Sequence, residues 1–325
     1  FSTAAMIWFR RGPHSLDIRV GRNQVLNSDS MRFCAPEDGG TSDPRYGQAI
    51  QTPQSKLPAM SPIFIDLPRV LPPVMDGTLD HVMMRVEDLE TSLDWYTEYL
   101  DYEEKGRWEA ETFTNVFVGP AEIHDDGALL ELTCNHDGRT YTQGDAWGHI
   151  AVRVEDVYKA YTELMDAGVT DYRDPDSCGG QYAFVTDPDG HEVEIVERDH
   201  GARWSLDHTM IRVEHGDSAI GWLTRKLEYE LFRRAELETF ALYFLKPVGA
   251  PDEAMSLELT VNYNNSTYDV GDAWGHVAAR VDDLKTDWQM LIDREAEAYR
   301  DPESCDYNYA FTKLPDGQEI ELVTR

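Results

Sequence analysis

The sequence predicts an α+β fold built from four βαβββ modules, and three observations lead to this prediction. Long stretches of the chain after the first quarter return 127 residues further on. Each long repeat contains two shorter units that open on a histidine followed by a short strand-like stretch. Within the units, a segment with the 3.6-residue period of a helix precedes β-rich stretches that are separated by Gly, Pro and Asp.

The long repeat is visible in whole motifs. "LDHVMMRVE" at Leu79 returns as "LDHTMIRVE" at Leu206, and "GDAWGHIAVRVED" at Gly144 returns as "GDAWGHVAARVDD" at Gly271. Self-similarity at one fixed spacing is typical of duplicated structural units. The sequence therefore predicts two homologous tandem domains, each made of two modules.

The predicted domains cover residues 76–200 and 203–325, and the segment before them differs in composition. Residues 1–74 hold nine of the 16 prolines and carry a slight basic excess, whereas the rest of the chain is strongly acidic. The chain starts at Phe1, and Met75 opens the region where periodic sequence begins. We expect 1–74 to be an extension that is disordered or not part of the native product.

Helices and strands can be placed within the modules. In the first module Asp88 is positioned to cap a helix whose apolar face is Leu89, Leu93, Tyr96 and Leu100. The third module carries Gly216 and Gly221 in the equivalent segment and predicts a weaker helix. The strand-like stretches include "TNVFVG", "ALLELT", "YAFVT" and "EVEIVE".

Charge and cysteine usage restrict the class of partner. The formal net charge is -32, and only seven of the 29 basic residues are lysines. Such a surface repels nucleic acid and anionic membranes, so we expect a small-molecule substrate. The same pattern suggests a halophilic cytoplasm, since molar salt shortens the Debye length to about 3 Å and so screens the repulsion between the acidic residues.

The four cysteines lack C-x-x-C pairs, and no stretch has the length and apolarity of a membrane helix, which favours a reduced intracellular protein.

Histidine and glutamate recur at fixed separations in all four modules. Each module opens with a His and ends in a strand containing a Glu, at separations of 50, 45, 50 and 45 residues. The eight residues are His81, Glu131, His149, Glu194, His208, Glu258, His276 and Glu321. Inward-facing carboxylates are costly to bury without a cation, and His with Glu suits a divalent metal with open coordination positions, namely Ni, Co, Zn or Mn.

Isolated histidines have a simpler interpretation. A single His at a strand start is usually a satisfied structural residue, and only the recurrence of four argues for ligands. The histidines without a repeat partner are expected at the surface: His14, His124, His136, His191, His200 and His215.

Because side chains alternate along a strand, Arg85 shares a face with His81, and Asn135 shares one with Glu131, about 13 Å away.

Four motifs together resemble glyoxalase I, of the vicinal oxygen chelate superfamily. They are "LDHVMMRVEDLETSLDWYTEYLDYE", "LLELTCN", "WGHIAVRVEDV" and "AFVTDPDGHEVEIVE", and the resemblance extends over residues 76–325 in a tandem two-domain form. It implies that modules from facing domains share each metal site, so we expect a monomer with intramolecular domain pairing. One implied set is His81, Glu131, His276 and Glu321. The other is His149, Glu194, His208 and Glu258.

The resemblance also implies the chemistry. A carbon–sulfur lyase of this kind converts the hemithioacetal of methylglyoxal and a thiol into S-lactoyl-thiol through an ene-diolate, which detoxifies methylglyoxal. Glu194 and Glu321 would be the bases. The residues implied to hold the γ-glutamyl end of the thiol are Arg85, Asn135, Arg212 and Asn262.

The sequence departs from the family at the other end of the thiol. Where glutathione-using members carry basic residues near the glycyl carboxylate, this chain has Asp145 and Asp272, and neither copy of the following loop contains lysine. We therefore expect γ-glutamylcysteine rather than glutathione, unless Arg173 or Arg300 replaces the missing lysine. Insertions that accompany zinc use in larger enzymes are not evident, which favours Ni or Co over Zn.

Other members of the superfamily are the alternatives. An extradiol dioxygenase has one Fe(II) site with two His and one carboxylate, whereas this chain has two complete His and Glu sets. A methylmalonyl-CoA epimerase usually has Gln where Glu131 and Glu258 stand. A non-catalytic drug-binding or metal-binding protein of the same fold would not need ligands in every module.

Overall fold

The computed structural model describes residues 11–12, 15–16, 78–123, 127–265 and 267–324. Two short strands, β1 (Arg11–Gly12) and β2 (Ser15–Leu16), pair with each other in antiparallel fashion. Apart from these two strands, the predicted extension over 1–74 lies outside the described residues, as do His14 and His124.

Each of the four predicted modules is present as a strand, a helix and further strands. The first is β3 (Leu79–Arg85), α1 (Leu89–Leu100), β4 (Tyr102–Glu109), β5 (Phe113–Pro120) and β6 (Leu129–Asn135). The second is β7 (Trp147–Val154), α2 (Val157–Asp166), β8 (Thr170–Arg173), β9 (Tyr182–Thr186) and β10 (Glu192–Glu197). The third is β11 (Leu206–Arg212), α3 (Gly216–Lys226), β12 (Tyr229–Glu236), β13 (Phe240–Pro247) and β14 (Ser256–Asn262).

The fourth module departs from the βαβββ plan. It comprises β15 (Trp274–Arg280), α4 (Leu284–Asp293), a 3-10 turn (Glu303–Cys305), β16 (Tyr309–Lys313) and β17 (Glu319–Val323). Its second strand is reduced to a single bridge between Arg300 and Phe311. The α+β class is confirmed, and the strand count of this one module was predicted wrongly.

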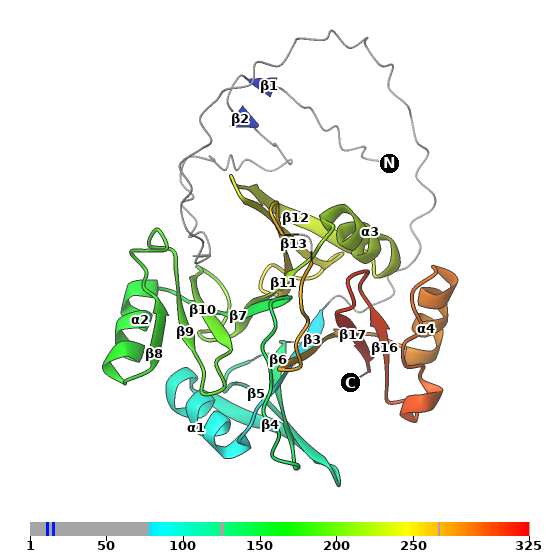
Figure 1. The fold of residues 1–325 in the computed structure, drawn as a ribbon, viewed down its shortest axis with the longest axis horizontal. Helices are drawn as coiled ribbons and strands as arrows, with labels where there is room; N and C mark the ends of the chain where they lie inside the picture. The colour runs from blue at the N-terminus through cyan, green and yellow to red at the C-terminus, as the bar shows by residue number, and fades with distance from the viewer. Residues whose placement is uncertain (1–10, 13–14, 17–77, 124–126, 266, 325) are drawn as a thin grey trace.

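Two mixed sheets are formed by modules from different sequence repeats. The seven-stranded sheet has the order β16-β17-β15-β3-β6-β5-β4, and the eight-stranded sheet has the order β12-β13-β14-β11-β7-β10-β9-β8. The modules join through antiparallel pairing of β3 with β15 and of β7 with β11. Figure 1 shows α1 and α2 on one side of the molecule and α3 and α4 on the other. The predicted domain limits at 76–200 and 203–325 follow the repeats, while each sheet takes strands from both.

Aspartate caps start three of the described helices, including the one predicted at Asp88. Asp88, Asp156 and Asp283 each accept a hydrogen bond from the backbone N–H three residues later. His215 precedes α3 and makes no side-chain cap bond, yet α3 runs for 11 residues. An apolar face packed against a sheet can stabilise a helix that has a poor cap and poor propensity.

The two repeats interlock where the loops before β7 and β15 cross. Gly144 and Gly271 both have φ of +67°, a left-handed conformation that favours glycine. A Cβ on Gly144 would lie 2.4 Å from the carbonyl oxygen of Asp269 in the opposite loop. Just beyond, Trp147 and Trp274 stack with ring centroids 5.5 Å apart. The crossing fixes the central strands of one sheet against those of the other.

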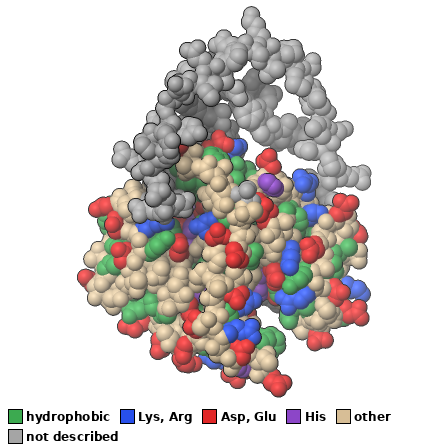
Figure 2. Space-filling model, in the orientation of Figure 1, with side chains coloured by type: hydrophobic (Ala, Val, Ile, Leu, Met, Phe, Trp, Pro, Cys, Tyr) green, Lys and Arg blue, Asp and Glu red, His purple; other side chains and the backbone are tan. Residues whose placement is uncertain are grey.

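The surface agrees with the charge of the chain. Acidic side chains are scattered over the face seen in Figure 2, and basic side chains gather in only a few places. None of the described helices has the length and apolarity needed to cross a membrane.

Candidate metal centres

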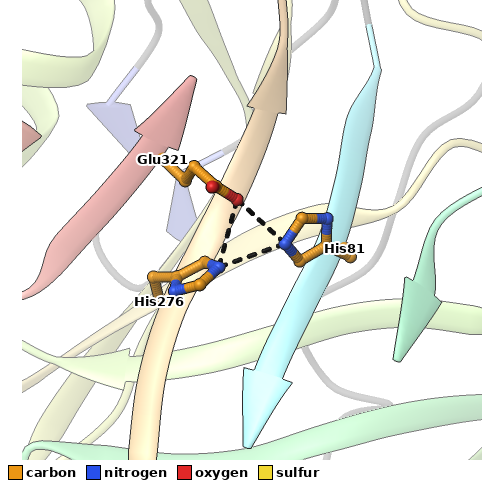
Figure 3. A group of neighbouring side chains, drawn as sticks. All are labelled: His81, His276 and Glu321. Carbon is orange, nitrogen blue, oxygen red and sulfur yellow. Dashed lines mark hydrogen bonds and ion pairs between the residues drawn. The ribbon is translucent and has the colours of Figure 1, made fainter. Parts of the chain in front are cut away.

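Four of the predicted ligands meet on the seven-stranded sheet, and we call His81, Glu131, His276 and Glu321 the first centre. The ligand-bearing strands are neighbours, because β3 pairs in parallel with β6, β15 pairs in parallel with β17, and β3 pairs with β15. His81 Nε2 lies 3.0 Å from Oε2 of Glu131 and 3.0 Å from Oε2 of Glu321. Figure 3 shows the two imidazoles and Glu321 pointing toward one another, with the two Nε2 atoms 3.1 Å apart.

The spacing of these atoms fits a single metal ion. Ligand atoms about 2.1 Å from an ion, and at right angles around it, lie about 3 Å from one another. His276 Nε2 lies 3.4 Å from Glu131 Oε2 and 3.2 Å from Glu321 Oε2, so the separations in the centre stay close to this value. All four residues are buried. Two neutral imidazoles and two carboxylates match a divalent cation in donor type, and they leave positions open for substrate oxygens.

The other four predicted ligands meet on the eight-stranded sheet, and we call His149, Glu194, His208 and Glu258 the second centre. Oε2 of Glu194 lies 3.0 Å from Nε2 of both His149 and His208. His208 Nε2 lies 3.1 Å from Oε2 of Glu258, and the two Nε2 atoms are 3.3 Å apart. The second centre therefore resembles the first, although over the described ranges Glu258 pairs with His208 alone whereas Glu131 pairs with both histidines of its centre.

Buried ion pairs orient one histidine in each centre. Asp80 accepts from Nδ1 of His81 at 2.9 Å and, through its other oxygen, from Nε and Nη2 of Arg280. In the second centre Asp207 contacts His208 Nδ1 at 2.8 Å and accepts from Arg153. A carboxylate on the remote nitrogen fixes the ring so that Nε2 faces the ion.

Sequence reasoning missed these aspartates, although the repeated "LDH" motif placed one directly before the His in both cases. The aspartate before each of these histidines recurs at the same 127-residue spacing as the histidine.

The two pairs of carboxylates differ in how they are held. Asn115 donates to Oε1 of Glu131 and is itself bonded by the Thr133 hydroxyl. Thr260 donates to Oε1 of Glu258 at 3.3 Å. Within the described part of the chain, Glu194 and Glu321 form ion pairs only to histidines, through Oε2. Among the described residues, Glu194 and Glu321 thus lack the amide or hydroxyl donor that the structure shows on Glu131 and Glu258.

The charges in the centres shift their pKa values strongly. Burial opposes protonation of His81, yet hydrogen bonds to Asp80, Glu131 and Glu321 raise its pKa well above the usual value. Burial alone would raise the pKa of Glu194, but His208 and His149 hold it far below the usual range. Glu194 is thus ionised, and protons compete with a metal ion for His81.

The four predicted thiol-binding residues occupy equivalent places around the two centres. Arg85 Nη1 donates to the carbonyl oxygens of Asp272 and Trp274, and Arg212 Nη1 donates to those of Asp145 and Trp147. Asn135 donates to the Tyr141 hydroxyl at 2.7 Å, as Asn262 does to that of Tyr268 at 3.1 Å. The pairs are related by the 127-residue repeat, so each sheet carries the same two polar side chains on its ligand-bearing strands.

A cavity of about 400 Å³ opens at the second centre. Its walls include His149, Glu194, His208 and Glu258 together with Arg212 and Asn262. One side is apolar, formed by Phe240, Leu242 and Phe244. A small molecule can therefore contact the predicted ligands and the predicted thiol-binding residues at once.

One histidine that we expected at the surface is buried. His136, His200 and His215 are exposed as predicted, but His191 is 0% exposed. Nδ1 of His191 contacts Oδ2 of Asp187 at 2.9 Å within the turn between β9 and β10, and the His191 ring packs against Trp274 with centroids 5.3 Å apart. This His has no repeat partner, since position 318 of the second repeat is Gln, and so the repeat gave no hint of its burial.

Comparison of the chain with known proteins identifies its family. Residues 78–195 match the Glyoxalase/Bleomycin resistance protein/Dioxygenase superfamily. A putative lactoylglutathione lyase of Brassica oleracea var. gemmifera is 30% identical over 209 residues, covering 63% of this chain and 73% of the relative. The chain belongs to the lactoylglutathione lyase family, that is, to glyoxalase I.

Other glyoxalase I proteins show both the short and the tandem form of this resemblance. Lactoylglutathione lyase of Neisseria meningitidis is 40% identical over 132 residues, which is 37% of this chain and 91% of the bacterial protein. The crystal structure of glyoxalase I from Zea mays has a TM-score of 0.69 at 26% identity, covering 77% of this chain and 92% of the maize chain.

Proposed function

We propose that this protein is a glyoxalase I that isomerises the hemithioacetal of methylglyoxal and a γ-glutamyl thiol at two metal centres. The observation that carries the proposal is the repeated set of two imidazoles and two carboxylates, with neighbouring ligand atoms 3.0–3.4 Å apart. A chain with one such set would fit several enzymes of this fold. Two complete sets on a glyoxalase I sequence favour the lyase.

The proposed chemistry needs a base next to the carbon between sulfur and carbonyl. Glu194 and Glu321 are the proposed bases, because each is buried, has a lowered pKa and lies against the histidines through Oε2. The carboxylate takes the proton from C1 and returns it to C2, so the hemithioacetal becomes a 2-hydroxythioester without net gain or loss of atoms. A divalent metal, when bound, polarises the two substrate oxygens.

Glu131 and Glu258 have a different proposed role. Hydrogen bonds from Asn115 and Thr260 restrain them, which suits ligands that stay in place during turnover. Arg85 with Asn135, and Arg212 with Asn262, are the proposed anchors of the γ-glutamyl end.

The finer properties belong to the same proposal. Nickel or cobalt is the proposed metal, γ-glutamylcysteine the proposed thiol, and a monomer in a salt-rich cytoplasm the proposed setting. The names of the relatives specify glutathione for those proteins. For this chain, Asp272 is held by the backbone N–H and hydroxyl of Thr142, which lower its pKa and keep it anionic where a glycyl carboxylate would be repelled.

Removing the bases one at a time tests the function and the number of centres. Glu321→Gln is expected to silence the first centre and Glu194→Gln the second, so each variant keeps part of the S-lactoyl-thiol formation. If the centres are independent, the two residual activities add up to that of the unmodified protein. The double variant is expected to lose activity by about 100-fold or more, the usual contribution of a positioned base. A single variant that is already inactive contradicts two independent centres.

A further inference from the structure

The cavity walls of the two centres differ at one cross-strand position. On β12, Arg233 lies opposite Phe244, which in turn lies opposite Glu258 on β14. On β4 the residue opposite Phe117 is Gly106, and Phe117 lies opposite Glu131 on β6. Residues paired across strands share one face of a sheet, so Arg233 and Gly106 both face the centres.

Arg233 is part of the cavity of the second centre. Its guanidinium carbon lies 4.7 Å from the ring centroid of Phe244, and the edge of that ring contacts His208 with centroids 5.6 Å apart. The residue lines the same cavity as Glu194 and Glu258. Burial, followed by the nearby Arg198, lowers the pKa of Arg233, while Glu258, Asp207 and Glu194 oppose this shift.

Two other arginines in this cavity have counterparts at the first centre, and a third is bonded to Asp207. Arg173 stacks on Phe184, and its counterpart Arg300 stacks on Phe311 with the guanidinium carbon 3.8 Å from the ring centroid. Arg212 likewise has Arg85 as its counterpart. Arg198 holds Asp207 through two hydrogen bonds of 2.9 Å. Arg233 is therefore the cation in the cavity that the first repeat replaces with glycine.

The position of Arg233 also indicates which part of a substrate it meets. Asn262, a proposed γ-glutamyl anchor, lies four residues along β14 from Glu258, about 13 Å away. Arg233 lies instead in the cross-strand row of Glu258 itself. A group beside Arg233 thus belongs to the part of the substrate near the reacting carbons.

We propose that the second centre is selective for hemithioacetals that carry a carboxylate near the reacting carbons, and that Arg233 binds this carboxylate. The proposal rests on the glyoxalase I function proposed above. The first centre, with Gly106 in this place, takes neutral side chains such as that of methylglyoxal. A guanidinium matches a carboxylate with two parallel hydrogen bonds, and Phe244 holds the guanidinium plane from one side.

Two sources can supply the carboxylate. One is a 2-oxoaldehyde whose carbon chain ends in a carboxylate. The other is the terminal carboxylate of the thiol, which glutathione places one residue beyond that of γ-glutamylcysteine.

The experiment measures kcat/KM in two backgrounds that leave one centre each. Glu321→Gln leaves the second centre, and Glu194→Gln leaves the first. The substrates are hemithioacetals of methylglyoxal and of a five-carbon 2-oxoaldehyde ending in a carboxylate, each made with γ-glutamylcysteine and with glutathione.

Two reciprocal exchanges test Arg233 and a third is the control. At the second centre, Arg233→Gly is expected to lower the preference for the added carboxylate by about 10-fold to 100-fold, the range for losing a charge-assisted pair. At the first centre, Gly106→Arg is expected to raise the preference for the added carboxylate, because it supplies a guanidinium there. The new side chain can be accommodated, since a Cβ at this position would lie 3.7 Å from Phe117 Cδ2, in ordinary contact. Arg234→Gly, on the exposed face of the same strand, is expected to leave the preference unchanged.

The substrate arms identify the source of the carboxylate. A change confined to the carboxylate-bearing aldehyde assigns the group to the aldehyde. A change confined to glutathione assigns it to the thiol and contradicts the prediction that γ-glutamylcysteine is the native thiol. The inference is overturned if Arg233→Gly and Gly106→Arg both leave the preference for the carboxylate-bearing aldehyde and the preference for glutathione unchanged while methylglyoxal is still turned over. Failure of the unmodified protein to turn over methylglyoxal with either thiol overturns the proposed function itself.

Discussion

Replacing Asp80 by Asn is expected to weaken metal binding at the first centre and to leave the second centre intact. Asp80 is 5% exposed and accepts from His81 Nδ1 at 2.9 Å. Asparagine keeps the shape and one acceptor oxygen but removes the charge that makes the imidazole a stronger ligand. Loss of such a partner typically lowers metal affinity by about 10-fold to 100-fold, or about 1.4–2.7 kcal/mol.

The same substitution is expected to destabilise the fold. Arg280, 7% exposed, donates to Asp80 from Nε at 3.1 Å and from Nη2 at 3.0 Å. With a neutral amide opposite it, the buried guanidinium loses its counterion, which costs about 1–3 kcal/mol of unfolding free energy. The melting temperature of the metal-free protein measures this loss of fold stability separately from the change in metal affinity.

Calorimetric titration of the metal-free protein with Ni²⁺ distinguishes the two centres. We expect two tight sites in the unmodified protein, and one tight and one weakened site in Asp80→Asn. Asp207→Asn is expected to give the same pattern through the second centre, and Asp94→Asn, at an exposed position of α1, should change neither site. Equal weakening of both sites by Asp80→Asn, or no weakening, would refute the assignment of this carboxylate to His81.

Three further predictions concern the thiol, the metal and a buried histidine. Because Asp145 and Asp272 replace basic residues, kcat/KM in high salt is expected to be higher with γ-glutamylcysteine than with glutathione; equal or better use of glutathione contradicts this. Ni²⁺ or Co²⁺ is expected to restore more turnover than Zn²⁺ to metal-free protein, and highest turnover with Zn²⁺ argues against nickel or cobalt as the metal. The affinity of the first centre for the metal should rise with pH, since the raised pKa of His81 means that a proton must leave before a metal binds. Burial lowers the pKa of His191 but Asp187 raises it further, to a net value above 6.5, so the pair stabilises the fold below that pH and the benefit fades as pH rises through the folded-state value. His191→Gln, which copies the other repeat, should therefore lower the melting temperature more at about pH 6 than at about pH 9, and a loss that is independent of pH would exclude the ion pair as its cause.

Local sequence was enough to predict much of the fold. Three of the four helices in the described part of the chain start at an aspartate cap that the sequence carries just ahead of an apolar face, because capping involves residues only three apart. Tyr96 and Leu100 are buried as their spacing predicts, whereas Leu89 and Leu93 are only partly buried. The second strand of the fourth module was predicted but is a single bridge at Arg300, since pairing along an edge depends on how the neighbouring turn packs.

The sequence by itself determined which residues form the four modules and which histidines and glutamates recur, because periodicity and repetition are properties of the chain alone. Only the tertiary structure decided what lies beside them. Asp80 meets Arg280 across 200 residues, and the ring of His191 packs against Trp274 of the other repeat. Arg233 shares a cavity with Glu194 because strands of different modules are neighbours in one sheet. Such contacts depend on strand order and register, which bring together side chains whose separation in the sequence follows no period.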